Sequence, residues 1–297
     1  MTISEPVETT ILQSVVEVAQ RILGERLEAI YAIGSLGHGG FLEAVSDVDI
    51  AVIVDRLSPG DRDLGERIRA GAEAQRMPLA ERLSVFWSDW RQLEGGTYGA
   101  GRFPAADRVD LVAAGRLLVG RDQRSRIATP STEELLLDAA SFATTRLLGG
   151  DLLRKLRNPQ EALGEGARAT TKLVLFPVRF IYTADCGRVG SNEDAANWYL
   201  TDQARPSGEL VAAAARWRRH GLPAADQAPE LTTAALAGVY REFCRDYARR
   251  LAPLGCSETI ESLHTFDAAL TASGQAFPGR NERPDPARIE RPVSSSG

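Results

Sequence analysis

The sequence predicts an α/β (α+β) domain with a mixed sheet, followed by an all-helical bundle domain. Residues 1–125 alternate between stretches of helical spacing and short runs rich in Val and Ile, which is the pattern of an α/β unit. From 126 to 275 the apolar residues follow the 3.6-residue period of amphipathic helices almost throughout. The boundary is expected between 122 and 132, where Pro130 interrupts the chain.

Strands and helices alternate in the first region. The run from Asp47 to Val54 is the clearest strand, because it is rich in Val and Ile. Helical spacing extends over 10–27 and 62–76. Glycines dominate the stretch 95–107, which is typical of a loop. The predicted strands span 29–33, 47–54 and 83–87.

Helices fill the second region. Ser131 followed by Glu134 has the spacing of a capping box, which marks a helix N-terminus. Pro177 is expected to kink its helix. The tail 276–297 is rich in proline and ends in serines, so we expect it to be disordered. The predicted helices span 133–148, 166–184, 192–201, 208–219, 231–251 and 258–272.

The segment 33–53 combines a Gly-Ser turn with two alternating acidic residues. Gly34 and Ser35 follow a predicted strand, and the N–H groups and the hydroxyl of such a turn can bind an anion. Asp47 and Asp49 lie two residues apart in a strand, so both project from the same face. Carboxylates are ligands of Mg²⁺, whose shell substrate phosphates often complete. The segment therefore predicts a site for nucleotide phosphates and a divalent metal.

This segment resembles the signature of the DNA polymerase β-like nucleotidyltransferase superfamily, which has a Gly-Ser turn followed by Asp-x-Asp in a strand. Within that superfamily the chain is most similar to the aminoglycoside adenylyltransferases of the streptomycin/spectinomycin type. Residues 108–122 look like the helix and Leu-x-Gly turn that close the family's catalytic domain. Residues 173–198 look like the core of its helical C-terminal domain. The resemblance covers about residues 20–200.

The resemblance implies an activity, its cofactors and its partners. It implies a catalytic domain over 1–125 and a helical domain over 126–275 that closes on substrate and nucleotide. The implied reaction transfers a nucleoside monophosphate, AMP from ATP, to a hydroxyl of a small molecule such as an aminoglycoside, as in antibiotic resistance. Two Mg²⁺ ions would be held by Asp47 and Asp49, with ATP as co-substrate. The partners would be a nucleoside triphosphate and a small-molecule acceptor.

The resemblance also indicates residues that bind the nucleotide. Gly34 and Ser35 would hold the β- and γ-phosphates, and Arg179 matches an arginine that lies near the phosphates in the family. A lysine of the family is replaced by Asn192. Lys172 lies seven residues before Arg179, hence on the same helix face, and can supply the missing charge. The alternative is an interdomain salt bridge for Arg179 and a solvated Lys172.

A third carboxylate stands on the third strand of the family and binds metal or deprotonates the acceptor. Superposition of the motif places Arg82 at that position. We expect the adjacent Glu81 to act as this third catalytic group beside Asp47 and Asp49, through a bulge that corrects its face. Asp110 is also acidic, but it is expected in the helix that closes the domain.

Two other functions remain open. The chain is either a transferase or a catalytically weak or inactive nucleotide-binding protein that acts through a partner, as the uncertain third acid suggests. Nucleotidylation of a protein hydroxyl is a third possibility, although proteins of that kind are usually much shorter. The basic run 216–220 is interpreted as a solvated helix face, and His38 as a loop histidine in water.

Composition agrees with a cytoplasmic enzyme. The net charge of −5 argues against general nucleic-acid binding, which needs a basic surface. The three cysteines have no metal-ligand spacing and form no disulfide framework, as expected in a reducing compartment. The N-terminus shows no signal peptide, and no apolar run reaches the ~20 residues that span a bilayer. The oligomeric state is not encoded in any visible pattern.

Overall fold

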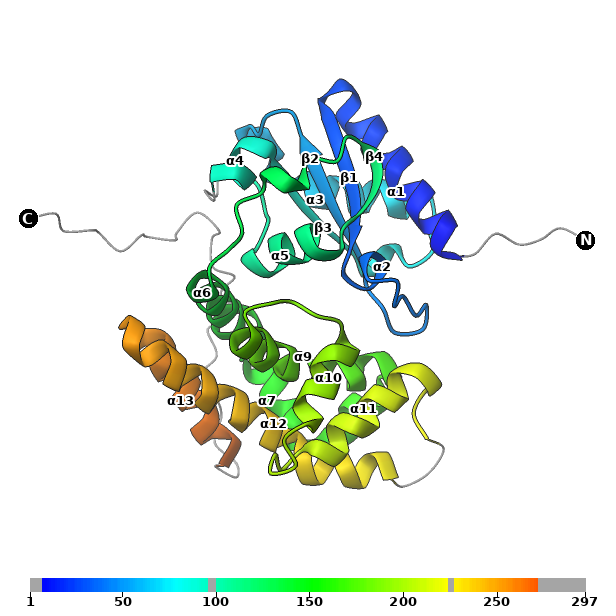
Figure 1. The fold of residues 1–297 in the computed structure, drawn as a ribbon. Coiled ribbons are helices and arrows are strands. Elements are labelled where there is room, and N and C mark those ends of the chain that lie inside the picture. Colours follow the sequence, from blue (N-terminus) through cyan, green and yellow to red (C-terminus); the bar gives the residue numbers. More distant parts are fainter. Residues whose placement is uncertain (1–6, 96–99, 224–226, 272–297) are drawn as a thin grey trace, which may run out of the picture.

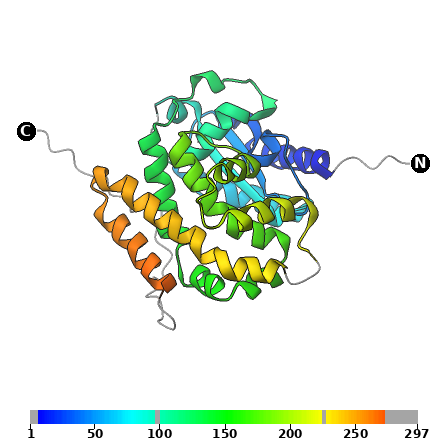
Figure 2. The same ribbon diagram turned by 60° about the horizontal axis from the view of Figure 1, so that its bottom comes forward.

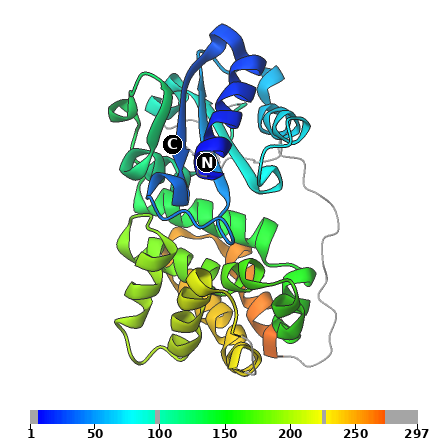
Figure 3. The same cartoon turned by 90° about the vertical axis from the view of Figure 1, so that its right-hand side faces the viewer.

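A computed structural model describes residues 7–95, 100–223 and 227–271. Figure 1 shows a sheet flanked by helices and, beside it, an assembly of helices alone, so the predicted architecture is confirmed. Figure 3 views this arrangement from the side, with the sheet region in blue and cyan and the helical region in green to orange. Part of the predicted loop, 96–99, and the predicted disordered tail, 276–297, lie outside the described residues.

A mixed four-stranded sheet forms the first region, as predicted. Strand β1 (Leu27–Ile33) pairs antiparallel with β2 (Val48–Val54) and with β4 (Arg116–Gly120), and β2 pairs parallel with β3 (Leu83–Asp89). The order across the sheet is β3-β2-β1-β4. The first three strands match the predicted ones, but β4 was expected to belong to a helix and turn. Its five residues are mostly exposed at the sheet edge, so they show no alternation of buried and exposed side chains. Pairing with β1 therefore decides that this segment is a strand.

The two faces of the sheet are covered differently. On one face Val48, Ile50 and Val52 pack with residues of α1 (Val7–Leu23) and α3 (Leu64–Ala74). On the other face the alternate residues Ala51 and Ile53 pack with residues of α4 and α5. Helix α4 spans Trp90–Gly95, and α5 spans Ala105–Ala114. Because side chains alternate along a strand, Asp49 shares its face with Ala51 and Ile53. The predicted separation of Asp49 from the Val48 face is thus confirmed.

Helices make up the second region, around one core. The predicted helix 133–148 divides into α6 and a π-helical turn, and two short helices that the sequence did not predict, α7 and α8, follow it. Figure 2 shows α12, in yellow to orange, alongside α13 in orange. None of the helices in the described part of the chain has the length and apolar character needed to cross a membrane. The bounds are Thr132–Phe142 for α6, Ala143–Leu147 for the π-helical turn, Gly150–Arg157 for α7, Pro159–Gly164 for α8, Ala167–Cys186 for α9, Asn192–Leu200 for α10, Gly208–His220 for α11, Gln227–Leu251 for α12 and Ser257–Thr271 for α13.

Helix α9 runs through the helical region and contacts α6, α8, α10, α11 and α12. It continues past Pro177, which has no N–H to donate to the carbonyl of Leu173. The hydroxyl of Tyr240 on α12 donates to that carbonyl at 2.9 Å. Two turns farther along each helix, Tyr247 donates to the carbonyl of Phe180 at 3.0 Å. Helix α12 therefore satisfies the carbonyl that the proline leaves free, and it holds α9 in place.

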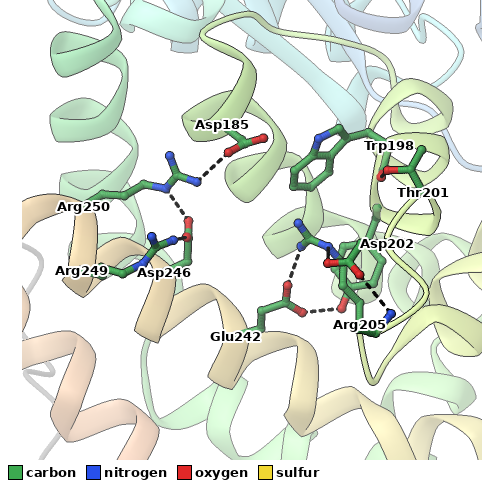
Figure 4. A network of polar contacts seen from close by, with 11 residues as sticks. Asp185, Trp198, Thr201, Asp202, Arg205, Glu242, Asp246, Arg249 and Arg250 are labelled. Carbon is green, nitrogen blue, oxygen red and sulfur yellow. Dashed lines mark hydrogen bonds and ion pairs between the residues drawn. The ribbon is translucent and has the colours of Figure 1, made fainter.

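Polar contacts attach the end of α10 and the end of α9 to α12 (Figure 4). The guanidinium of Arg205 lies over the ring of Trp198 at 4.3 Å and pairs with Glu242 at 2.5 Å. Farther along α12, Arg250 pairs with Asp185 at 3.0 Å and with Asp246 at 2.7 Å. These contacts brace the helix that carries the cations of the candidate site.

Candidate functional site

The predicted Gly-Ser turn lies between β1 and β2, directly after Ile33. Gly34 opens the short helix α2 (Gly34–Gly37) with φ +59°, in the left-handed region that favours glycine. A Cβ on Gly34 would lie 2.6 Å from Oδ2 of Asp49. A Cβ on Gly37 would lie 2.7 Å from the carbonyl oxygen of Ala114, at the end of α5. The turn is therefore packed between the acidic strand and α5, which explains both glycines.

A Gly34→Ala substitution is expected to destabilise the protein. Left-handed backbone costs a residue with a Cβ about 1–2 kcal/mol, and the Asp49 contact adds to that cost. Gly39→Ala is a matched control, because Gly39 also has positive φ (+71°) but nothing lies within 4 Å of its Cβ position. Urea unfolding should show a larger loss for Gly34→Ala than for Gly39→Ala. Equal losses would mean that the contact with Asp49 carries no energy.

Asp47 and Asp49 are brought together as predicted. Asp49 lies in β2 opposite Ile33 of β1 and Ser84 of β3. Burial, followed by the negative charge of Asp47, raises the pKa of Asp49 to about 7, against the opposing charges of Arg179 and Lys172. A bound metal cation can take the place of the proton on a carboxyl group whose pKa is raised in this way.

Helix α9 places cations on Asp47. Nζ of Lys172 lies 2.8 Å from Oδ2 of Asp47, and the guanidinium of Arg168 pairs with Oδ1 of the same carboxylate. Burial of Asp47 acts to raise its pKa, but the hydrogen bonds and charges of Lys172 and Arg168 outweigh it, so the pKa is lowered. Arg179, predicted to bind the nucleotide, is near enough to shift the pKa of Asp49.

The sequence did not predict two cations at this site, Arg168 and Arg218. Arg168 lies four residues before Lys172, so helical spacing alone could have placed it on the same face. Arg218 of α11 donates to Oγ of Ser46 at 3.0 Å, next to Asp47. Burial and then the charge of Arg179 lower the pKa of Arg218. The interpretation of the basic run 216–220 as one solvated face was therefore wrong for Arg218.

Helix α5 adds two carboxylates and a histidine contact. Asp110 is 5% exposed, and its Oδ2 accepts the N–H of Gly34 at 2.6 Å. Its Oδ1 lies 2.6 Å from Nε2 of His38, so His38 is not the free loop histidine that was expected. One helical turn earlier, Asp107 is electrostatically coupled to the same site, because burial and then the charges of Asp49 and Asp110 raise its pKa. Their spacing, i and i+3 on one helix, was the available signal.

Glu81 does not join this group. It lies in a 3₁₀ turn, Ala80–Arg82, where its side chain is 67% exposed and pairs with Arg82. The strand register places Ser84, rather than Arg82 or Glu81, opposite Asp49. Within the ranges that the structure describes, no three His, Cys, Asp or Glu side chains are grouped so that they could hold a metal ion. The expectation that Glu81 completes a set of three with Asp47 and Asp49 was therefore wrong.

The residues present fit Mg²⁺ in one mode of binding. Asp47, directly before β2, and Asp49, within it, offer two carboxylates beside the Gly34-Ser35 turn. Mg²⁺ is typically held by one or two carboxylates, with waters and substrate phosphates completing its shell. The site fits an ion that arrives with a phosphate ligand, because the described part of the chain offers no protein cage for the ion alone.

Comparison with known proteins gives matches among solved structures only. No family model matches the chain, and no curated protein matches it. The chain is similar to the crystal structure of spectinomycin adenyltransferase AAD(9) from Enterococcus faecialis with ATP and spectinomycin. The two are 12% identical, with a TM-score of 0.48, and the match covers 88% of this chain and 98% of the other. A likeness of this size assigns neither a family nor an activity.

Proposed function

We propose that the chain is a Mg²⁺-dependent nucleotidyltransferase that moves a nucleoside monophosphate, AMP from ATP, onto a hydroxyl of a small molecule. The observation that carries the proposal is the pair of carboxylates, Asp47 and Asp49, beside the Gly34-Ser35 turn. Lys172 of α9 forms an ion pair with Asp47. Two acids, an anion-binding turn and cations from a second domain are the components that phosphoryl-group transfer needs. Residues 1–125 would form the catalytic domain, and 126–275 the domain that closes over it.

Each group has a proposed role. Asp47 and Asp49 would hold Mg²⁺, which when bound neutralises phosphate charge and polarises the phosphorus that is attacked. The Ser35 hydroxyl would donate to a phosphate oxygen. Lys172 and Arg179 would pair with the triphosphate, so Lys172 would exchange its contact with Asp47 for one with a phosphate. That exchange would free Oδ2 of Asp47 for the metal, while Arg168 pairs with Oδ1 of the same carboxylate.

Asp107 is the group that we propose as the general base for the acceptor hydroxyl. A base works best when its pKa lies near the working pH, and burial beside Asp49 and Asp110 raises the pKa of Asp107. Ser84, opposite Asp49, has no charge and cannot take this role at neutral pH.

The test is release of pyrophosphate from ATP and Mg²⁺ with a panel of hydroxyl-bearing acceptors, beginning with streptomycin and spectinomycin because of the sequence resemblance. We expect acceptor-dependent release that Asp47→Asn removes. Calorimetry with MgATP on both proteins distinguishes loss of binding from loss of turnover. Release that survives Asp47→Asn would overturn the proposal.

A second candidate function is nucleotide binding without turnover, through a partner protein. It is favoured by Ser84, because the strand beside Asp49 carries no acid at that level. Calorimetric binding of MgATP, without pyrophosphate release for any acceptor of the panel, would support this second function over the first.

A further inference from the structure

We propose that Asp110 is a positioning residue for the nucleotide turn, which it fixes through Gly34 and His38. One oxygen of its carboxylate accepts the N–H of Gly34 at 2.6 Å, and the other lies 2.6 Å from Nε2 of His38. Both partners belong to the turn, at its first residue and directly after α2. The link to nucleotide binding rests on the proposed function, whereas the two contacts themselves do not.

The surroundings of Asp110 favour a rigid bridge. Its side chain is almost fully buried, and a buried carboxylate is costly unless hydrogen bonds and an opposite charge compensate it. His38 provides that charge when it is protonated: the hydrogen bond to Asp110 is the largest cause of its raised pKa, and burial opposes it. The other charged groups that act on His38 are Asp194, which also raises its pKa, and Arg179, which lowers it.

The bridge changes what the turn can offer to a phosphate. The N–H of Gly34 was predicted to donate to the nucleotide, but in the structure it donates to Asp110. The Ser35 hydroxyl and the α9 cations can then serve as partners for phosphate oxygens. When protonated, His38 compensates the Asp110 charge, which otherwise would repel a triphosphate bound at the turn.

This charge balance predicts an order among variants. His38→Ala leaves a buried carboxylate without its cation, so MgATP affinity should fall by about tenfold or more. Asp110→Ala loses both contacts and should weaken binding by a similar factor. Asp110→Asn keeps an acceptor for the Gly34 N–H and removes the negative charge, so its effect should be smaller. Adding Asp110→Asn to His38→Ala should restore part of the lost affinity, which a merely structural role would not explain.

Asp138→Ala is the matched control. Asp138 of α6 also accepts a backbone N–H of α5, that of Ala105 at 2.7 Å, but it does not touch the turn. Its removal should cost stability without changing MgATP affinity. Calorimetry measures affinity, and urea unfolding measures stability, for every variant of the full chain.

A readout without nucleotide separates this inference from the proposed function. Proton NMR titration should show the pKa of His38 above that of a free histidine in the wild type and closer to it in Asp110→Asn. An unchanged His38 pKa, or equal losses of affinity in Asp110→Ala and Asp138→Ala, would overturn the inference. If the wild type binds no MgATP, the proposed function fails and the nucleotide role of Asp110 fails with it, whereas a fall in the His38 pKa still supports the bridge.

Discussion

Asp49→Asn is expected to abolish nucleotidyl transfer and at the same time to stabilise the metal-free protein. Transfer should fall by about 10³-fold or more, because the loss of a charged metal ligand removes several kcal/mol of transition-state stabilisation. Pyrophosphate release under saturating MgATP measures this effect. Asparagine has nearly the same shape as aspartate, so the fold should be retained.

The gain in stability follows from the direction of the pKa shift. In the folded protein the pKa of Asp49 rises to about 7 from an ordinary value of 3.8, so between these values the folded state holds a proton that the unfolded chain has lost. Stability therefore falls as the pH rises through this window. Asparagine has no charge to bury. We expect a higher melting temperature for Asp49→Asn at pH 8 without metal, and a difference that shrinks towards pH 4.

Asp61→Asn is a control whose melting temperature should change in the opposite direction; Asp61 lies in a turn after β2. Asp61 is buried and pairs with Arg26 at 2.8 Å, and this hydrogen bond is the main reason that its pKa falls to about 2. Its contribution to stability is present above the unfolded pKa and is lost as the pH falls towards 2. Asp61→Asn should therefore lower the melting temperature at pH 8 and leave transfer nearly unchanged. A lower melting temperature in Asp49→Asn as well would contradict the proposed cost of burying the Asp49 charge.

Asp107→Asn is expected to lower kcat by about 10²–10⁴-fold, the usual contribution of a general base. MgATP affinity should change little, because the base acts on the acceptor rather than on the triphosphate. The acid side of the pH profile of kcat reports ionisation of the base, and this limb should disappear in the variant.

Glu81→Gln is the matched comparison for Asp107→Asn. Both changes neutralise one carboxylate, but Glu81 is exposed and paired with Arg82, whereas Asp107 is coupled to Asp49. We expect Glu81→Gln to retain nearly full activity. A larger loss of kcat in Glu81→Gln than in Asp107→Asn would restore the interpretation made from the sequence and remove Asp107 from the mechanism.

Local patterns predicted much of the fold. The Val- and Ile-rich run predicted β2, which contains Asp49 and directly follows Asp47. Helix-capping residues predicted the start of α6, where Ser131 accepts the N–H of Glu134. The apolar residues of α9 keep a helical period on both sides of Pro177, and this period predicted one long helix. The short elements α7, α8 and β4 carry too few residues for a periodic signal, and contacts with their neighbours decide them.

The sequence by itself determined the two acids of β2, the glycine turn before them and the cationic face of α9, because each depends on spacing within one element. Only the tertiary structure decided which groups meet. Strand register put Ser84 beside Asp49, and the packing of α5 put Asp110 on Gly34. The helical region brought Arg168, Lys172 and Arg218 to the start of β2. Contacts between elements far apart in the chain depend on register and packing, and spacing within one element does not encode either.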